Sequence, residues 1–249
     1  MVPNRPNLEV PRAFLPIFDK TNPYYYAEHL TFYGGRGAAK SWQIGRAVLG
    51  RMLDESLLVL CGREYQNSID DSVYAVLEGQ ARLLGIHNRF RWLNNRVIAD
   101  TGSEAMFKGL GRNIDSIKSL EDVKLAWLVE ARTISAYTLE VLLPTIRRPD
   151  SQIITDFNTG LASDPIYKEL VTGHQAHNYL CKVTYLNNPY LPEKLKRQAE
   201  RMKATDYDRY LNVWLGELAT RNDAQVLKGK FVVKRFERPA TVDGGNYFG

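Results

Sequence analysis

The clearest chemical signal in the sequence is a glycine-rich segment, Gly34-Gly35-Arg36-Gly37-Ala38-Ala39-Lys40-Ser41. In such a loop, glycines let successive backbone N–H groups turn toward the β- and γ-phosphates of a nucleotide, and the following helix adds its positive amino end. Lys40 would then supply a charge to those phosphates, and Ser41 a hydroxyl to Mg²⁺. The pattern predicts a Walker A phosphate loop that binds ATP with Mg²⁺.

Two positions of this loop need separate interpretation. Ala39 stands where a glycine usually precedes the lysine, so its backbone either keeps a negative φ or carries mild strain. Arg36 could stabilise charge on the γ-phosphate in the transition state, or could pair with a surface carboxylate. A plain glycine turn is the alternative for the whole segment, but the predicted strand before it, the helix after it and the Lys-Ser pair favour nucleotide binding.

Hydrolysis also needs carboxylates, one for the metal and one to orient the attacking water. The apolar stretch 125–129 ends in a single acid, Glu130, where two acids are usual. Asp156 ends another predicted strand and could reach a Mg²⁺-bound water, with Asn158 sensing the γ-phosphate. The alternative is that Asp156 caps the Asn-Thr-Gly turn that follows it, and both interpretations stay open.

The elements that must position these residues alternate along the chain. Apolar runs predict a strand at 30–33 leading into the loop, and helical spacing follows over 42–54. Further strands are predicted at 57–61, 90–92, 96–98, 105–107, 125–129, 152–156 and 179–185, and helices at 68–84 and 135–143. This order predicts an α/β fold with a mainly parallel sheet flanked by helices. In an additional-strand P-loop ATPase, the strand ending at Asp156 would lie between the loop strand and the acidic strand.

The composition is that of a globular protein, with 44% hydrophobic and 24% charged residues. No apolar run approaches the roughly 20 residues that span a bilayer, so no membrane partner is expected. Cys61 and Cys181 are predicted to be reduced core residues, because they lie far apart inside apolar stretches. His174 and His177 are interpreted as exposed loop residues, since no third metal ligand lies at a suitable spacing.

The net charge of +5 is unevenly distributed. Residues 193–238 hold 12 Lys plus Arg against 7 Asp plus Glu, which accounts for the whole excess. Such asymmetry is typical of a surface that faces a polyanion. The alternative is an ordinary solvent-exposed helix with no such partner. We predict a P-loop core at 1–190, a basic helical lid or linker subdomain at 191–238 with helices at 193–202 and 207–215, and a linker at 239–249 toward a domain that the chain lacks.

Six segments together resemble the ATPase half of the large terminase subunit of tailed bacteriophages, the motor that packages DNA. They are YGGRGAAKSW (33–42), CGREYQNSI (61–69), IKSLE (117–121), LLPTIRRP (142–149), NNPYLP (187–192) and VWLGE (213–217). They occur in the order of that family and cover nearly the whole chain. The loop alone would be weak support, whereas the ordered set is specific.

The resemblance implies roles for individual residues. Lys40 and Ser41 would hold phosphate and Mg²⁺, Arg36 would act on the γ-phosphate, Glu130 would be the catalytic glutamate, and Asn158 would belong to the motif that couples nucleotide state to DNA movement. It also implies double-stranded DNA, a portal protein and a small terminase subunit as partners, in a ring usually of five copies in the cytoplasm of an infected bacterium. The nuclease domain of such proteins would be missing from this chain, so no nuclease activity is expected.

Three departures from the family pattern stand out. Val129 occupies the place of the first of two acids, and Arg132 replaces a residue that is commonly polar and neutral. The sequence DFNT at 156–159 replaces a pattern that usually ends in Asn-Pro. Two other functions therefore stay open: a nucleotide-binding but poorly hydrolysing remnant or scaffold from a degenerate prophage, and a helicase or recombinase ATPase. The VWLGE segment and the arginine within the loop argue against the latter.

Overall fold

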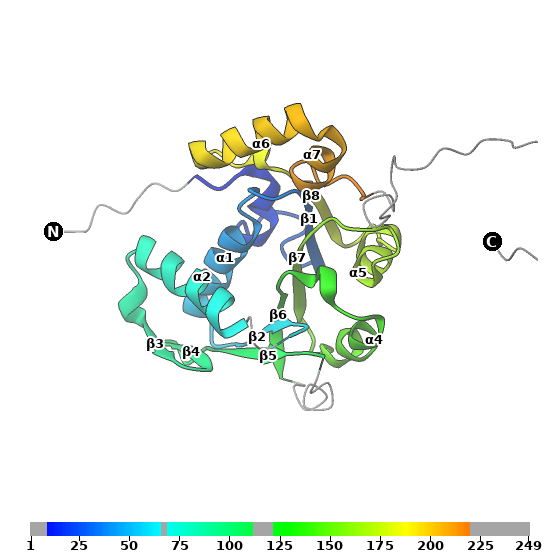
Figure 1. Ribbon diagram of the computed structural model, residues 1–249. Coiled ribbons are helices and arrows are strands. Elements are labelled where there is room, and N and C mark those ends of the chain that lie inside the picture. The colour runs from blue at the N-terminus through cyan, green and yellow to red at the C-terminus, as the bar shows by residue number, and fades with distance from the viewer. Residues whose placement is uncertain (1–8, 66–68, 112–121, 220–249) are drawn as a thin grey trace, which may run out of the picture. The chain divides into compact units, whose positions relative to one another are not determined.

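The computed structural model describes residues 9–65, 69–111 and 122–219 (Figure 1). The chain as far as residue 219 forms one compact unit, which carries every element below. The predicted linker 239–249 lies outside the described residues, as do the part of the predicted subdomain 191–238 that follows residue 219 and the IKSLE motif. The predicted boundary at residue 190 therefore stays a prediction.

Within the described residues, eight strands form one sheet in the order β3-β4-β5-β2-β6-β7-β1-β8. The strands are β1 (His29–Gly34), β2 (Leu58–Arg63), β3 (Phe90–Leu93), β4 (Arg96–Ala99), β5 (Glu104–Gly109), β6 (Val123–Leu128), β7 (Gln152–Asn158) and β8 (Tyr179–Val183). In this spatial order, all neighbouring pairs from β5 through β2, β6, β7 and β1 to β8 are parallel. The pairs β3–β4 and β4–β5 are antiparallel. The predicted mainly parallel α/β sheet is confirmed.

The centre of the sheet brings the candidate residues together. β7 lies between β6 and β1, as predicted, and its register pairs Asn158 with Gly34 of β1 and Thr155 with Leu128 of β6. Because these strands are parallel, their carboxyl ends meet at one edge of the sheet. The phosphate loop, the residues after β6 and the end of β7 all emerge there.

Helices cover both faces of the sheet (Figure 1). The helices α1 (Lys40–Asp54) and α2 (Ile69–Leu83) pack on one face, and α4 (Ala136–Thr145) and α5 (Pro165–Tyr167) on the other. Successive residues of buried strands point to opposite faces, so Trp127 joins the apolar cluster under α1 and Leu128 the cluster under α4. None of the helices in the described ranges is long and apolar enough to cross a membrane.

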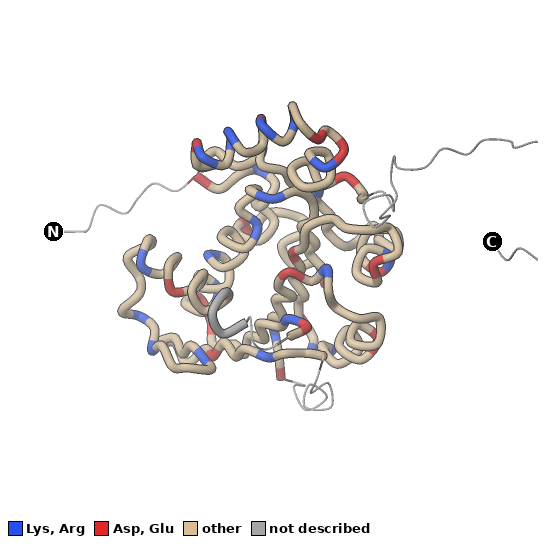
Figure 2. The backbone as a smooth tube through the Cα atoms, in the orientation of Figure 1, with Lys and Arg blue, Asp and Glu red and all other residues tan. Residues whose placement is uncertain are grey.

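Two further helices, α6 (Glu193–Thr205) and α7 (Tyr207–Val213), confirm the prediction of a helical segment after the sheet. They pack on one another through a small apolar cluster of their own, which contains Tyr185, Leu191, Ala199, Tyr210 and Trp214. Figure 2 shows Lys and Arg along the length of α6.

Three details correct the sequence-based expectations. The last strand ends at Val183 rather than 185, because Thr184 and Asn187 cap a short helical turn that begins there. Cys181 is not a core residue, because the edge strand β8 leaves it partly exposed, whereas Cys61 is buried. The acidic strand ends at Leu128, so Val129 already belongs to the connection that follows.

Candidate active site

The phosphate loop connects β1 to α1 at the carboxyl edge of the sheet. The Nζ atom of Lys40 donates hydrogen bonds to the Gly35 carbonyl at 2.7 Å and to Asn158 Oδ1 at 2.9 Å. Only 7% of Lys40 is exposed, and burial lowers its pKa to about 8, an effect that the nearby charge of Asp156 opposes. The ammonium group of Lys40 is therefore held under the loop by these two acceptors.

The backbone at Ala39 adopts a left-handed conformation, with φ 59° and ψ 21°. This settles the alternative left open by the sequence, because a non-glycine residue in that region carries strain on the order of 1–2 kcal/mol. Gly37, two residues earlier, also has a positive φ of 75°. The loop therefore keeps the curvature of a phosphate loop without the usual glycine.

Asp156 lies directly beneath the start of α1. Ser41 Oγ donates to its Oδ2 atom at 3.0 Å, and the indole Nε1 of Trp127 donates to its Oδ1 atom at 2.7 Å. Only 2% of Asp156 is exposed. Burial raises its pKa above the usual value, against the Trp127 hydrogen bond, the charge of Lys40 and the Ser41 hydrogen bond. Both carboxylate oxygens are thus directed under the loop rather than toward the turn after β7.

The register brings Asp156 next to Val129, the position at which the family pattern predicts an acid. Leu128 pairs with Thr155, so the next residues along the two parallel chains, Val129 and Asp156, come side by side on the face toward α1. Neighbouring strands are only about 4.8 Å apart. Val129 is 4% exposed and packs into the apolar cluster on that face. The carboxylate of Asp156 therefore lies one strand away from the side chain of Val129.

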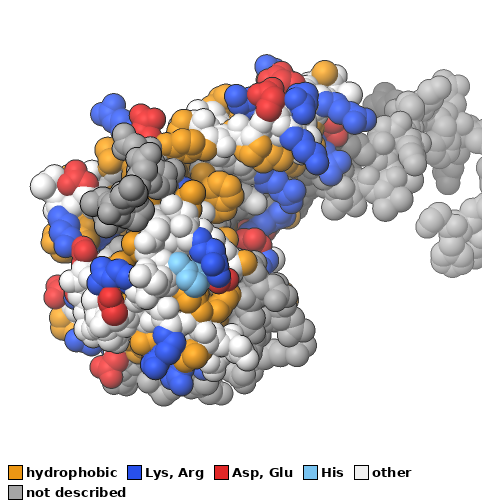
Figure 3. Space-filling model, turned by 90° about the vertical axis from the view of Figure 1, so that its left-hand side faces the viewer, with side chains coloured by type: hydrophobic (Ala, Val, Ile, Leu, Met, Phe, Trp, Pro, Cys, Tyr) orange, Lys and Arg blue, Asp and Glu red, His pale blue; other side chains and the backbone are white. Residues whose placement is uncertain are grey.

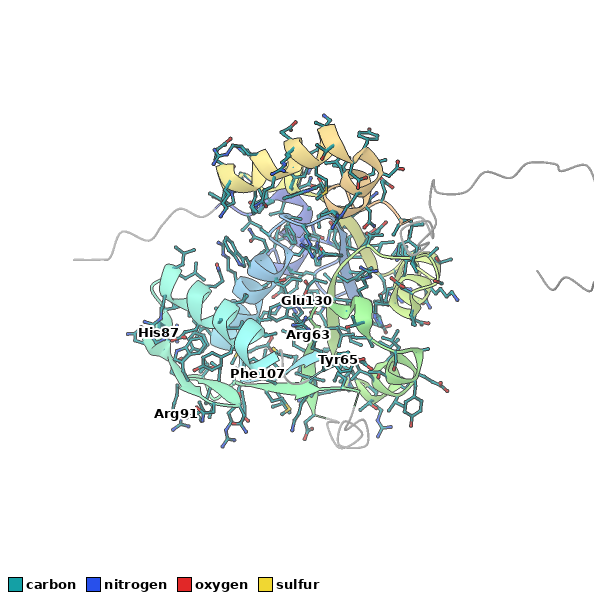
Figure 4. All side chains as sticks on the ribbon, viewed as in Figure 1. Arg63, Tyr65, His87, Arg91, Phe107 and Glu130 are labelled. Carbon is teal, nitrogen blue, oxygen red and sulfur yellow. The ribbon has the colours of Figure 1, made fainter. Side chains whose placement is uncertain are left out.

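Glu130 follows β6 with a left-handed backbone, φ 48°. Its exposed carboxylate forms an ion pair with Arg63, the last residue of β2 (Figure 4). Because β2 and β6 are parallel neighbours, both side chains reach the same edge of the sheet. The predicted catalytic glutamate is therefore present at the site and is held by a residue that sequence reasoning did not single out.

A pocket of about 910 Å³ opens over these groups. Its inner wall holds loop residues together with Glu130, Asp156 and Asn158. Its outer wall comes from the chain after β8, and includes Asn188, Leu191, Leu195, Arg201, Met202, Arg209 and Trp214. A cleft of this size, with apolar walls and a few convergent polar groups, is typical of a small-molecule site. Arg36, which is exposed, lies on the same lining.

The segment containing α6 and α7 is fastened to the loop backbone. The backbone N–H of Arg36 donates to the Val213 carbonyl at 2.8 Å, and Asn188 Nδ2 donates to the Gly37 carbonyl at 2.8 Å. The NNPYLP and VWLGE motifs therefore contact the phosphate loop directly. The sequence indicated these two motifs only through the family resemblance, because no local pattern showed that they would contact the phosphate loop.

Elsewhere the described residues contain no group of three or more His, Cys, Asp or Glu side chains that could hold a metal ion. His174 and His177 are exposed, as predicted. An Mg²⁺ ion prefers oxygen ligands and keeps several waters, so one hydroxyl and one carboxylate beside bound phosphates are enough to hold it. Ser41 and Asp156 match that set of donors.

A parallel sheet with an added strand between the loop strand and the acidic strand, and with Lys40 under a glycine loop, defines a P-loop ATPase fold. The model of the family described as phage terminase large subunit matches residues 27–217. The chain belongs to that family.

Individual relatives agree with this assignment. The PBSX phage terminase large subunit of Bacillus subtilis (strain 168) is 22% identical over 200 residues, covering 71% of this chain and 46% of the relative. The large terminase of a thermophilic bacteriophage, solved in complex with ATP-gamma-S, superposes with a TM-score of 0.68 at 13% identity, covering 93% of this chain and 59% of that one. The large terminase ATPase domain of Thermus phage P74-26 gives 0.60 at 14% identity, covering 83% and 92%. The chain spans about half the length of the curated relatives it matches.

Proposed function

We propose that this chain is the ATPase motor domain of a phage terminase large subunit, which couples ATP hydrolysis to translocation of double-stranded viral DNA into a procapsid. The observation that carries the proposal is the convergence of Lys40, Ser41, Asp156, Asn158 and Glu130 on one pocket. The test is a steady-state ATP hydrolysis assay with and without double-stranded DNA. Hydrolysis that DNA stimulates supports the proposal, and a protein that binds ATP without hydrolysing it contradicts it.

Each residue has a chemical role in this proposal. The loop backbone from Gly34 to Ser41 surrounds the phosphates, and Lys40 and Arg36 neutralise charge that develops on the γ-phosphate. Glu130 orients the attacking water after leaving Arg63. Ser41 and Asp156 hold Mg²⁺ and its waters, and the ion supplies charge neutralisation to the phosphates when bound. Asn158 reports the γ-phosphate through its contact with Lys40.

Trp127 is expected to position Asp156, which leads to a prediction for Trp127→Phe. The variant keeps an aromatic ring in the core but removes the N–H that donates to Asp156 at 2.7 Å. We expect the Mg²⁺ concentration for half-maximal hydrolysis to rise several-fold, because the carboxylate loses its shorter hydrogen bond, with a stability loss of about 1–3 kcal/mol. Titration of Mg²⁺ in the hydrolysis assay measures this.

The control for Trp127→Phe is Leu142→Ala, which makes a cavity under α4 on the opposite face of the sheet. It should cost about 2–5 kcal/mol of stability and leave the Mg²⁺ dependence unchanged. An unchanged Mg²⁺ dependence in Trp127→Phe would show that the indole of Trp127 packs in the core without positioning Asp156.

DNA is the proposed polyanionic partner, and α6 is the described element that suits it. Residues 193–205 hold five Lys or Arg against two acids. Figure 3 shows basic side chains gathered at the level of α6 and α7, with acidic ones among them. Residues 220–238 hold six Lys or Arg against two acids, so most of the excess charge lies outside the described part.

Charge reversal on α6 is therefore expected to weaken DNA binding moderately. Lys194 and Arg197 are exposed, and neither lines the nucleotide pocket, unlike Arg201. The double variant Lys194→Glu/Arg197→Glu should lower the affinity for double-stranded DNA about tenfold at low salt and flatten the salt dependence, because fewer counterions are released. Fluorescence anisotropy over a salt series measures both.

A matched control reverses two exposed charges away from α6, Arg91→Glu/Lys168→Glu. Its DNA affinity should stay within twofold of the parent. Equal losses in both double variants would mean that the effect follows net charge and not the position of α6.

The remaining partners and the setting are also proposals. A portal protein, a small terminase subunit and a homo-oligomeric ring, usually of five copies, would complete the motor, which would act in the cytoplasm of an infected bacterium. Residues 191–238 would form a lid and linker subdomain and 239–249 a linker. A second candidate function, a nucleotide-binding remnant that hydrolyses poorly, is favoured by one observation, the apolar side chain of Val129 beside the metal site.

A further inference from the structure

A second, smaller pocket of about 220 Å³ adjoins the nucleotide pocket. Four residues line both pockets: Arg36, Glu130, Asn158 and Val213. Lys40 Nζ donates to Asn158, one of these shared residues, at 2.9 Å. The shared wall therefore lies at the ammonium end of Lys40, the residue proposed to contact the terminal phosphates. The smaller pocket therefore begins next to the expected place of the γ-phosphate.

The lining of the smaller pocket is suited to an oxyanion. Besides Arg36, it is lined by a second arginine, Arg132, and by two threonines, Thr133 and Thr159. Thr159 is only 3% exposed, and its Oγ1 atom has no hydrogen-bond partner within the described part of the chain. Burying a hydroxyl without a hydrogen-bond partner costs folding free energy, unless a bound ligand or water supplies the partner. Because Thr159 lines the pocket, an anion bound there is a candidate acceptor for this hydroxyl.

Local structure holds Arg132 at this position. Its Nε atom lies 3.4 Å from Asp164 Oδ2, and the backbone N–H of Leu161 donates to the same carboxylate oxygen at 2.9 Å. The pair lies against Gly160, where a Cβ atom would overlap both Arg132 and Asp164. The turn after β7 therefore needs a glycine so that Arg132 can lie along it.

The back wall is fixed by Asn212 of α7. Its Nδ2 atom donates to the Thr159 carbonyl at 3.0 Å and to the Glu217 carbonyl at 2.6 Å, so it braces the wall. Glu130 is the acid on the lining, and its charge is compensated by Arg63. Because Arg132 is likewise paired with Asp164, the excess positive charge on the lining comes from Arg36, and this charge favours a phosphate anion.

We propose that this pocket is a binding site for inorganic phosphate, which it receives from the nucleotide pocket after hydrolysis and holds before release. The proposal rests on the proposed ATPase function. A phosphodiester of DNA offers the same oxygens, but the shared wall with the nucleotide pocket and the small volume favour free phosphate. Arg132, which departs from the family pattern, thereby gains a role.

The experiment titrates inorganic phosphate into the protein saturated with Mg²⁺ and ADP, with calorimetry as the readout. Arg132→Gln is expected to raise the dissociation constant for phosphate about tenfold or more, because a charged hydrogen-bond donor is lost, and Thr159→Val about fivefold. Neither residue lines the nucleotide pocket, so ADP affinity should stay within twofold in both variants. Arg91→Gln removes an exposed charge elsewhere and should change neither constant.

The outcomes separate the two proposals. A parent protein that fails to bind ADP overturns the ATPase assignment. A parent that binds ADP but not phosphate, or variants whose phosphate affinity stays within twofold of the parent, overturns the phosphate site alone. In a parallel titration, a short single-stranded oligonucleotide should leave the phosphate affinity unchanged, and competition between the two would show that the pocket serves DNA instead.

Discussion

Replacing Lys40 with alanine is expected to lower ATP hydrolysis by about 10²–10³-fold, the usual effect of losing one preorganised charge at a transition state. Lys40 is the buried cation of the loop, whereas Arg36 is exposed, and the ammonium of Lys40 is already held under the loop by Gly35 and Asn158. The measurement is steady-state phosphate production at saturating Mg²⁺ and ATP.

The fold should survive the same substitution. Lys40 is buried, and burial lowers its pKa to about 8, so the folded protein gains little from its charge. The thermal midpoint of Lys40→Ala should therefore stay close to that of the parent. Arg46→Ala, a cation of α1 that bonds Gln80 away from the loop, is the matched control and should keep its turnover. Turnover within threefold of the parent in a folded Lys40→Ala protein would refute the phosphate-loop assignment.

The second large effect is expected at Asp156. Asp156→Asn keeps the size of the side chain but removes the carboxylate that faces Ser41, and we expect hydrolysis to fall by about 10²-fold. Since Val129 lies beside Asp156 in the register, Val129→Glu should restore part of the activity in the Asp156→Asn background. The gain should be smaller in the parent, because both carboxylates would serve one metal.

The polar isostere Val129→Gln is the control for this cycle. It places a similar side chain into the apolar cluster without a charge, and thus measures the cost of burying a polar group there. If Val129→Glu and Val129→Gln act alike, or if Val129→Glu gives equal gains in both backgrounds, Asp156 does not replace the missing acid. The chain would then be a weakly hydrolysing member of its family, with Glu130 as the acid that remains.

Local patterns in the sequence determined the elements and their order. The glycine segment, the apolar runs and the helical spacing after Ser41 gave β1, the loop and α1, because each depends on residues close together in the chain. The alternation of strands and helices indicated a parallel sheet, since parallel strands need crossover connections. Placement of β7 between β6 and β1 followed from the resemblance to additional-strand ATPases, and the structure confirms it.

Contacts between distant segments were decided only by the tertiary structure. The hydrogen bond from Trp127 to Asp156 depends on which residues of two strands come side by side, and no local pattern encodes that register. Local sequence likewise left open whether Ala39 has a negative or a positive φ, and the structure shows a positive φ of 59°. Sequence alone thus named Asp156 as a candidate and left its partner open, because the partner is 29 positions away in the chain and one strand away in the sheet.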